Sequence, residues 1–264
     1  MLLARTFILM EVSCLKVFRQ FMSKISLIIQ ARLGSSRLKG KTLMNLAGKP
    51  LIFRIVERVK RCKQIDNLIL AIPDTEADAK ITKINFGCNL KIFRGSENDL
   101  VSRYFYAAKK YNSKIVVRLP GDNCMPEPSE IDRIILFYKK FKNPFFASNL
   151  SNILNNQYPD GIGAEVFGFN YLDDLMNMRL SKEKKEHIHL NFFDYKLNRP
   201  INEKWCKIRT IKCPKEFRRP EICLDVNTIE DYKFINDIYE NLYYTKPKFK
   251  ITDIINYLDK KNEK

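Results

Sequence analysis

The spacing of its apolar segments constrains the fold of this chain more than any other feature. Short apolar runs alternate with amphipathic segments across residues 24–141, so that a strand–helix unit recurs about every 25 residues. The runs typical of strands cover 25–30, 67–72, 90–93 and 114–119. The amphipathic segments typical of helices cover 50–62, 75–85, 97–111 and 128–141. This alternation predicts an α/β fold with a parallel sheet and crossover helices.

The second half of the chain is less regular. Strands are expected at 163–169, 205–211 and 221–226, and helices at 182–198, 228–243 and 251–261. No internal repeat, low-complexity tract or linker rich in Gly and Pro divides the sequence. We therefore expect one domain over residues 23–264.

Residues 1–22 differ from the rest. The apolar stretch "TFILM" is followed by Glu11, Lys16 and Arg19, so the segment is too short and too charged to span a bilayer. It also lacks the clean apolar run and small-residue cleavage site of a secretory signal. We expect translation to begin at Met22 and the preceding residues to be an extension that takes no part in the fold.

The charge of the chain is strongly positive. The formal net charge is +17, from 47 Lys and Arg against 30 Asp and Glu, which invites a nucleic-acid interpretation. The lysines are scattered through every expected helix and form no long basic run, so we interpret them as a solvated surface that steers anionic small substrates toward the protein. We expect no nucleic-acid partner and no membrane insertion. Seven cysteines without a C-x-x-C pair argue against a disulfide framework and a structural zinc site, and indicate a reducing cytoplasm.

The segment "QARLGSSRLKGKTL", residues 30–43, follows the first expected strand and combines glycines and serines with arginines and lysines. A loop of this kind can direct several backbone N–H groups at one anion while its cations neutralise the charge. Gly40, Lys41 and Thr42 supply the end of the motif G-x-x-x-x-G-K-[ST], but Ser35 stands where that motif requires its first glycine. The loop therefore predicts a phosphate site of another kind.

A second polar segment, "PGDNCMPEP", follows the fourth expected strand and carries Asp122 two residues after Pro120. In open α/β sheets, ligands bind beyond the carboxyl ends of the strands, where the loop 31–42 also lies. A carboxylate opposite a phosphate loop suits a magnesium nucleotide. Pro, Gly, Asp and Asn are also favoured in turns, so this segment alone fits a turn equally well.

Six segments, in order, resemble the sugar cytidylyltransferases, and most closely the group that includes the spore-coat polysaccharide biosynthesis proteins and relatives of the 3-deoxy-manno-octulosonate and acylneuraminate cytidylyltransferases. The segments are "SLIIQARLGSSRLKGKTLMNLAGKPLIFRIVERVKR", "FRGSENDLVSRYFYAA", "VVRLPGDNCMPEPSEID", "YPDGIGAEVF", "KEHI" and "LDVNTIEDYKFI". The resemblance runs from about residue 24 to residue 243. It implies a Rossmann-like nucleotidyltransferase fold, a mixed and mostly parallel sheet with helices on both faces. It also implies transfer of CMP from CTP to a sugar or sugar acid, with release of pyrophosphate and with Mg²⁺ as cofactor.

The resemblance also implies roles for individual residues. The nucleotide side comprises Ala31, Arg32, Gly34, Ser35, Arg37, Lys41, Arg94, Gly95 and Asp99, of which Arg32, Arg37 and Lys41 are the expected catalytic cations. The sugar side comprises Asp160, Glu165 and His187, and the metal side Asp122 and Asp225. Fixed cations suit this chemistry without reference to any family, because nucleotidyl transfer depends on positioning and on stabilising spreading negative charge.

Two positions depart from the family pattern. Lys39 stands where proline is usual, and Asn227 replaces a residue that is commonly acidic. An amide is a weaker ligand for a hard cation than a carboxylate. Either Asp225 makes the second metal contact, or Asp122 acts alone, or the chain no longer catalyses.

Several alternatives stay open from the sequence. Glu165 fits a carboxylate paired with a nearby lysine at the edge of the core, and His187 a partly buried structural residue; with His189 it makes a poor metal pair if both lie on one helix. The whole chain could instead be a glycosyltransferase of similar fold, although only the single Asp122 stands where a D-x-D motif would be expected, or a catalytically silent nucleotide-binding protein. We expect a homodimer that forms through residues 163–211. The sequence does not identify the sugar, and no residue in it indicates a contact that would select cytosine.

Overall fold

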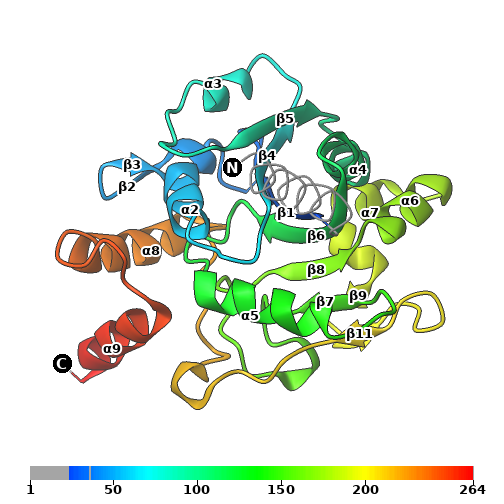
Figure 1. Ribbon diagram of the computed structural model, residues 1–264. Coiled ribbons are helices and arrows are strands. Elements are labelled where there is room, and N and C mark those ends of the chain that lie inside the picture. The colour runs from blue at the N-terminus through cyan, green and yellow to red at the C-terminus, as the bar shows by residue number, and fades with distance from the viewer. Residues whose placement is uncertain (1–23, 36, 264) are drawn as a thin grey trace, which may run out of the picture.

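The computed structural model describes residues 24–35 and 37–263, and its centre is a seven-stranded sheet with the order β11-β7-β8-β6-β1-β4-β5 (Figure 1). The strands are β1 (Lys24–Gln30), β4 (Asn67–Pro73), β5 (Lys91–Gly95), β6 (Ser113–Pro120), β7 (Phe146–Ser148), β8 (Glu165–Gly168) and β11 (Ile208–Arg209). β8 is antiparallel to both of its neighbours, β6 and β7, and the other pairs are parallel. The expectation of a mixed, mostly parallel sheet is confirmed. The expected extension at residues 1–22 lies outside the described residues.

Helices cover both faces of the sheet. The helices are α2 (Leu51–Val59), α3 (Ala79–Thr82), α4 (Leu100–Lys110), α5 (Pro128–Lys139), α6 (Phe169–Asn177), α7 (Lys182–Glu186), α8 (Ile229–Leu242) and α9 (Ile251–Asn262). Side chains alternate along a strand, so β1 contributes to two separate cores. Leu27 and Ile29 pack with α2, α5, α8 and α9, whereas Ile28 packs on the opposite face with α4 and α6.

Short elements complete the chain. They are the two-stranded ribbons β2 (Asn45–Leu46) with β3 (Lys49–Pro50) and β9 (Phe193–Asp194) with β10 (Arg199–Pro200), and the 3₁₀ turns η1 (Lys41–Leu43), η2 (Ile153–Asn155), η3 (Ile188–Asn191) and η4 (Lys215–Phe217). None of the helices within 24–35 and 37–263 is long and apolar enough to cross a membrane.

The second half differs from the sequence prediction in several places, of which two bear on the site. The helix expected over 182–198 ends at Glu186, because Phe192 and Phe193 are buried in the core beside α6 and the chain must turn to place them there. The strand expected over 221–226 forms only isolated bridges, Cys223 with Asp160 and Asp225 with Asn123. Both departures bring polar side chains to the carboxyl ends of the central strands.

Several expected elements exist but are shorter. The helix expected over 75–85 is regular only over Ala79–Thr82, and the strands expected over 163–169 and 205–211 shrink to Glu165–Gly168 and Ile208–Arg209. Local patterns identify such elements better than they locate the ends, which depend on tertiary packing.

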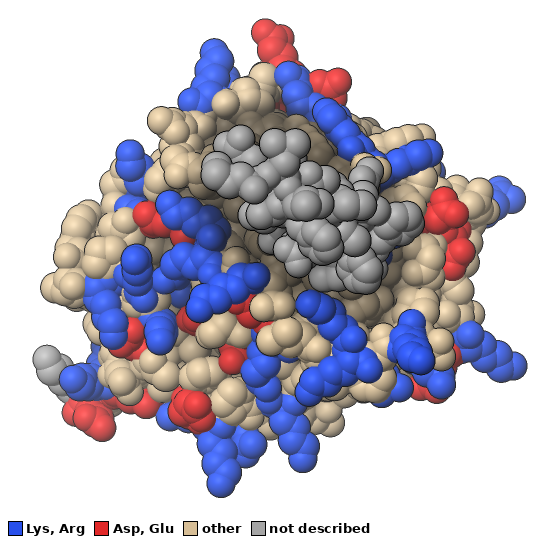
Figure 2. Space-filling model, in the orientation of Figure 1, with Lys and Arg blue, Asp and Glu red and all other residues tan. Residues whose placement is uncertain are grey.

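Basic side chains spread over one face of the molecule in several groups with acidic side chains between them (Figure 2). Among the described residues that this view leaves visible, they do not gather into one continuous stripe of the kind that tracks a nucleic-acid backbone.

Candidate active site

A cleft of about 1100 Å³ lies at the carboxyl ends of β1 and β6. Ten of the residues singled out from the sequence line it: Ala31, Arg32, Ser35, Arg37, Lys41, Asp122, Asp160, Glu165, His187 and Asp225. Seven ionisable residues that were not among the expected site residues also line it: Glu97, Arg103, Arg118, Glu186, His189, Tyr195 and Lys196. The loop after β1 and the loop after β6 therefore share one concave site.

The loop after β1, here called the phosphate-type loop, is held in its conformation by backbone hydrogen bonds of its own and by one neighbouring carboxylate. Gly40 donates its N–H to the carbonyl of Leu33 at 3.1 Å, and Leu33 donates its own N–H to Asp78 at 2.7 Å. Gly40 adopts φ 70°, a left-handed conformation that glycine adopts at little cost, and it caps the turn η1 that begins at Lys41. The turn thus aims Lys41 into the cleft.

Lys41 meets the acidic loop directly. Its Nζ lies 2.6 Å from the carbonyl oxygen of Val226 and 3.1 Å from Oδ2 of Asp122, and the residue is only 8% exposed. The loop that carries Asp122 approaches β1 very closely, because a Cβ on Gly121 would lie 2.1 Å from the carbonyl oxygen of Gln30. Glycine at position 121 is therefore what allows Asp122 to face Lys41.

The other two expected catalytic cations lie at the mouth of the cleft. Arg32 forms an ion pair with Glu186 of α7 at 2.7 Å, and this hydrogen bond lowers the pKa of the Glu186 carboxyl. Arg37 is exposed and lines the same cleft. The loop therefore presents three cations, two at the rim and one buried.

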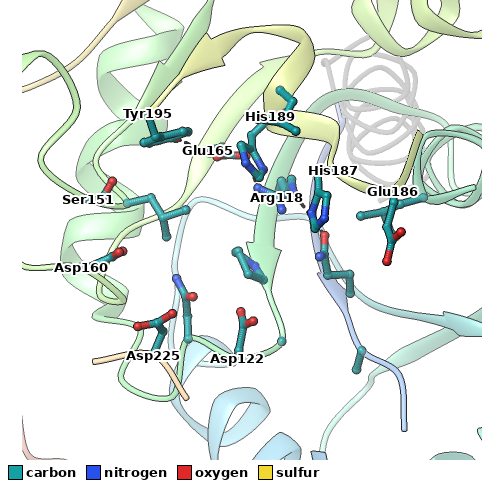
Figure 3. A pocket seen from close by; sticks show the side chains of 18 of the residues that line it. Arg118, Asp122, Ser151, Asp160, Glu165, Glu186, His187, His189, Tyr195 and Asp225 are labelled. Atoms are coloured by element: carbon teal, nitrogen blue, oxygen red, sulfur yellow. Dashed lines mark hydrogen bonds and ion pairs between the residues drawn. The ribbon is translucent and has the colours of Figure 1, made fainter. Parts of the chain in front are cut away.

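Acidic side chains gather on one side of the cleft (Figure 3). Asp160, Cys223 and Asp225 each offer a ligand atom, and these atoms lie within 4.8 Å of one another. Burial raises the pKa of Asp160 to about 7, and the negative charge of Asp225 acts in the same direction. Asn227 donates its side-chain N–H to Asp225, and its Oδ1 is buried without a hydrogen-bond partner among the described residues.

The carboxylates of Asp160 and Asp225 fit a hard divalent cation, because such ions prefer oxygen ligands, whereas the thiol of Cys223 is not a ligand of that kind. Asp225 lies with Asp160, while Asp122 contacts Lys41; a metal held by Asp122 and Asp225 stays a prediction. Asn227, which departs from the family pattern, supports Asp225 through its amide.

A buried charge network forms another wall. Arg118 of β6 and Glu165 of β8 are directly opposite in the antiparallel pairing, and Arg118 Nη1 lies 2.5 Å from Glu165 Oε2. Tyr195 donates its hydroxyl to the other carboxylate oxygen at 2.9 Å. Burial acts to lower the pKa of Arg118, but the charge of Glu165 outweighs it and the pKa is raised. Both oxygens of Glu165 are thus engaged within the protein, which suits a positioning role.

The two histidines lie beside this network rather than on opposite sides of one α-helix, because α7 ends at Glu186, before both of them. Their ring centroids are 5.8 Å apart, and the ring of His189 packs edge-on against Tyr195 at 5.4 Å. Burial lowers the pKa of His189 to about 4, and the nearby charge of Arg118 acts in the same direction. His189 is therefore neutral at physiological pH, and His187 is the more exposed of the two residues.

Four expected nucleotide-side residues do not line the cleft. Gly34 lies in the loop, and Arg94 pairs with Asp74 at 2.8 Å. The carbonyl of Gly95 accepts the N–H of Asp74, while Asp99 caps α4 by accepting the N–H of Ser102 at 2.8 Å. These contacts hold β5 and α4 in place beside the site.

The sequence matches the Cytidylyltransferase family over residues 26–251. This chain belongs to the cytidylyltransferase family. It is 30% identical over 244 residues to the spore coat polysaccharide biosynthesis protein SpsF of Bacillus subtilis, a match that covers 90% of this chain and 95% of that protein.

Solved structures of cytidylyltransferases have the same fold. A cytidylyltransferase from Leptospira borgpetersenii superposes with a TM-score of 0.78 at 26% identity, covering 91% of this chain and 96% of that one. A CMP:2-keto-3-deoxy-manno-octonic acid synthetase solved in complex with CTP superposes with a TM-score of 0.60 at 17% identity, covering 83% and 99%. The expected nucleotidyltransferase fold and the family resemblance are both confirmed.

Proposed function

We propose that this cytidylyltransferase transfers CMP from CTP to a sugar or sugar acid and releases pyrophosphate, as a step in making a surface polysaccharide or glycan. The observation that supports this most strongly is the position of Lys41, which lies between Asp122 and the carbonyl of Val226 in the cleft that Arg32 and Arg37 also line. A buried cation beside carboxylates, at the end of a phosphate-type loop, is suited to a metal-bound triphosphate.

The two sides of the cleft have different roles in the proposed reaction, one toward the phosphates and the other toward the acceptor. An acceptor hydroxyl oxygen forms a bond to the α-phosphorus, the bond from that phosphorus to the bridging oxygen breaks, and pyrophosphate leaves with the electron pair while the hydroxyl proton is released to solvent. Arg32, Arg37 and Lys41 stabilise the charge that develops on the phosphates. The acceptor lies on the side of Asp160, His187 and the network around Glu165, which fixes the wall of that pocket.

We assign the metal, Mg²⁺ in the cell, to Asp225 and Asp160 with Asp122 facing the phosphates. When bound, such an ion neutralises phosphate oxygens and polarises the α-phosphorus. The ligand atoms of Asp160 and Asp225 already lie close together, and Asn227 donates its side-chain N–H to Asp225. This assignment makes Asn227 compatible with catalysis, because it positions Asp225 rather than replacing it.

We also propose that the enzyme works in the cytoplasm as a homodimer that forms through residues 163–211. This segment carries three of the large apolar side chains that are exposed in the single chain, Met178, Leu197 and Ile201. Exposed apolar side chains of this kind are commonly covered by a second subunit. Sedimentation of the wild-type protein and of a Leu197→Asp variant tests this: we expect a dimer that the substitution dissociates, and a wild-type monomer would contradict it.

Pyrophosphate release measured with CTP, Mg²⁺ and a panel of neutral sugars and sugar acids tests the proposed reaction. We expect release that depends on one class of acceptor, with formation of the matching CMP-sugar. A glycosyltransferase would release no pyrophosphate from CTP, and a catalytically silent protein would bind CTP without turnover. Either result would refute the proposal.

A further inference from the structure

Gln30, the last residue of β1, has a polar side chain in the cleft to which the proposed reaction has so far given no role. The residue is half-buried and lines the cleft. Its Oε1 accepts the Nε–H of Arg118 at 3.2 Å. Because a guanidinium can only donate, this contact decides which end of the amide is oxygen and which is nitrogen. The two N–H groups of Nε2 are therefore directed elsewhere.

These two N–H groups are accessible to a ligand. Within residues 24–35 and 37–263, no hydrogen bond uses Nε2 of Gln30, and the side-chain atoms that are both buried and unpartnered belong to other residues, so Nε2 keeps accessible surface in the cleft. The bond to Oε1 holds the amide in one orientation, and Arg118 is itself held by Glu165, whose Oε2 lies 2.5 Å from its Nη1. Gln30 thus offers a neutral donor whose direction is fixed before any ligand binds.

The position of Gln30 indicates where on the substrates this donor acts. The phosphate-type loop continues directly from it, beginning with Ala31. The loop that carries Asp122 packs against its backbone, since a Cβ on Gly121 would lie 2.1 Å from the carbonyl oxygen of Gln30. On the other side, the hydrogen bond to Arg118 joins Gln30 to the wall that the proposed function gives to the acceptor. Gln30 therefore stands at the junction of the two sides, where the α-phosphorus and the acceptor hydroxyl meet.

The chemistry of the reaction distinguishes between these two groups. The attacking hydroxyl oxygen uses a lone pair to form the bond to phosphorus, so an N–H donated to that oxygen would oppose the attack. The non-bridging oxygens of the α-phosphate carry negative charge, and a fixed donor directed at one of them stabilises the transition state. A side chain that can only donate here is therefore suited to the α-phosphate.

We propose that Gln30 is a catalytic residue that donates an Nε2–H to one non-bridging oxygen of the α-phosphate, and that Arg118 is the positioning residue that orients it. This inference rests on the proposed function and deepens it by giving the transferred phosphate a contact of its own. Arg32, Arg37 and Lys41 then serve the pyrophosphate that leaves.

Pyrophosphate release by Gln30→Met and Gln30→Glu, with the acceptor that supports release by wild type, tests the role in catalysis. Methionine keeps the length of the side chain without the donor, so kcat should fall by roughly 10²-fold, as for the loss of one oxyanion donor. Glutamate still accepts the Nε–H of Arg118 but turns a negative oxygen toward the phosphate, so this variant should be slower still. Gln64→Met, at a half-buried glutamine outside the cleft, is the matched control and should keep the wild-type rate.

Phosphorothioate analogues of CTP give a readout that a merely structural role of Gln30 would not move. Sulfur in place of one non-bridging α-oxygen accepts an N–H weakly, so wild type should be slow with the diastereomer whose sulfur faces Gln30. Replacing Mg²⁺ by the softer Cd²⁺ should not restore the rate with this diastereomer, which separates the donor effect from a metal contact. In Gln30→Met the rate ratio between CTP and this diastereomer should shrink, because the contact that sulfur weakens is already absent.

The outcomes separate this inference from the proposed function. A wild-type kcat in either variant, or an unchanged phosphorothioate effect in Gln30→Met, would overturn the inference alone. A raised KM for the acceptor with unchanged kcat would assign Gln30 to the acceptor and overturn it equally. If wild type releases no pyrophosphate from CTP with any acceptor, the proposed function fails and this role fails with it. Gln30→Glu keeps the partner of Arg118, so circular dichroism should show it folded even if Gln30→Met is not.

Discussion

The buried pair of Arg118 and Glu165 gives the sharpest stability prediction. Glu165 is fully buried and Arg118 is 3% exposed, and the two carboxylate oxygens accept bonds from Arg118 and Tyr195. Glu165→Gln keeps the shape but removes the negative charge, which leaves the guanidinium buried without its counter-charge. Breaking such a pair by removing one partner typically costs about 3–5 kcal/mol.

That loss is large enough to measure in two ways. For a chain of this size, each kcal/mol lowers the melting temperature by roughly 2–4 °C, so we expect a decrease of about 6–20 °C for Glu165→Gln. Urea unfolding at a fixed temperature should show the same loss of unfolding free energy. The exposed Glu240 on α8 is the matched control, and Glu240→Gln should stay within about 0.5 kcal/mol of wild type.

A double variant separates the charge effect from simple loss of packing. In Arg118→Met with Glu165→Gln neither charge of this pair remains, so the double variant should be less destabilised than Glu165→Gln alone. The view that this network stabilises the cleft wall would be refuted if the free energy of unfolding of Glu165→Gln lay within about 1 kcal/mol of the wild-type value, which is roughly the precision of such measurements. It would also be refuted by a double variant that loses the sum of both single effects.

Three further results are expected. In Gly121→Ala the new Cβ would lie 2.1 Å from the Gln30 carbonyl oxygen, so the loop bearing Asp122 must shift. The free energy of unfolding should fall by about 1–3 kcal/mol and the rate of pyrophosphate release should drop. A wild-type rate in this variant would show that the close approach is unimportant. Thr228→Ala removes the capping box at the start of α8 and should cost about 1 kcal/mol in urea unfolding, whereas an unchanged midpoint would mean that the cap contributes nothing. Chelation of divalent cations should abolish pyrophosphate release and added Mg²⁺ or Mn²⁺ should restore it, whereas release that survives exhaustive chelation would contradict the metal assignment.

Much of the first half of the fold could be predicted from local patterns. The β-branched runs at 25–30, 67–72 and 114–119 form β1, β4 and β6, because a central strand buried on both faces requires a continuous apolar run. The sequence pattern also predicts that the loop after β1 and Asp122 after β6 lie at the same edge of the sheet, where the parallel strands have their carboxyl ends. The juxtaposition of Lys41 and Asp122 follows from topology, although the sequence gives no distance between them.

The second half could not be predicted as well, because long-range packing determines it. Residues 192 and 193 are buried against α6, which overrides the helical charge pattern of the segment before them. The role of Arg118 was overlooked even though a charged residue inside the apolar strand "KIVVRL" was a visible signal of a buried partner. Arg103 left no such signal, since its spacing on α4 is that of an ordinary polar position.

The most direct test of the central claim is the rate of pyrophosphate release from CTP by the Lys41→Ala variant, compared with wild type and with Lys39→Ala. Lys39 belongs to the same loop but is exposed and does not line the cleft, so its removal changes the net charge equally without touching the site. Loss of a group that stabilises the transition state typically costs about 3–4 kcal/mol, so Lys41→Ala should be slower by roughly 10²–10³-fold and Lys39→Ala should remain near wild type. Similar rates in both variants would contradict the assignment of this cleft as the site of nucleotidyl transfer.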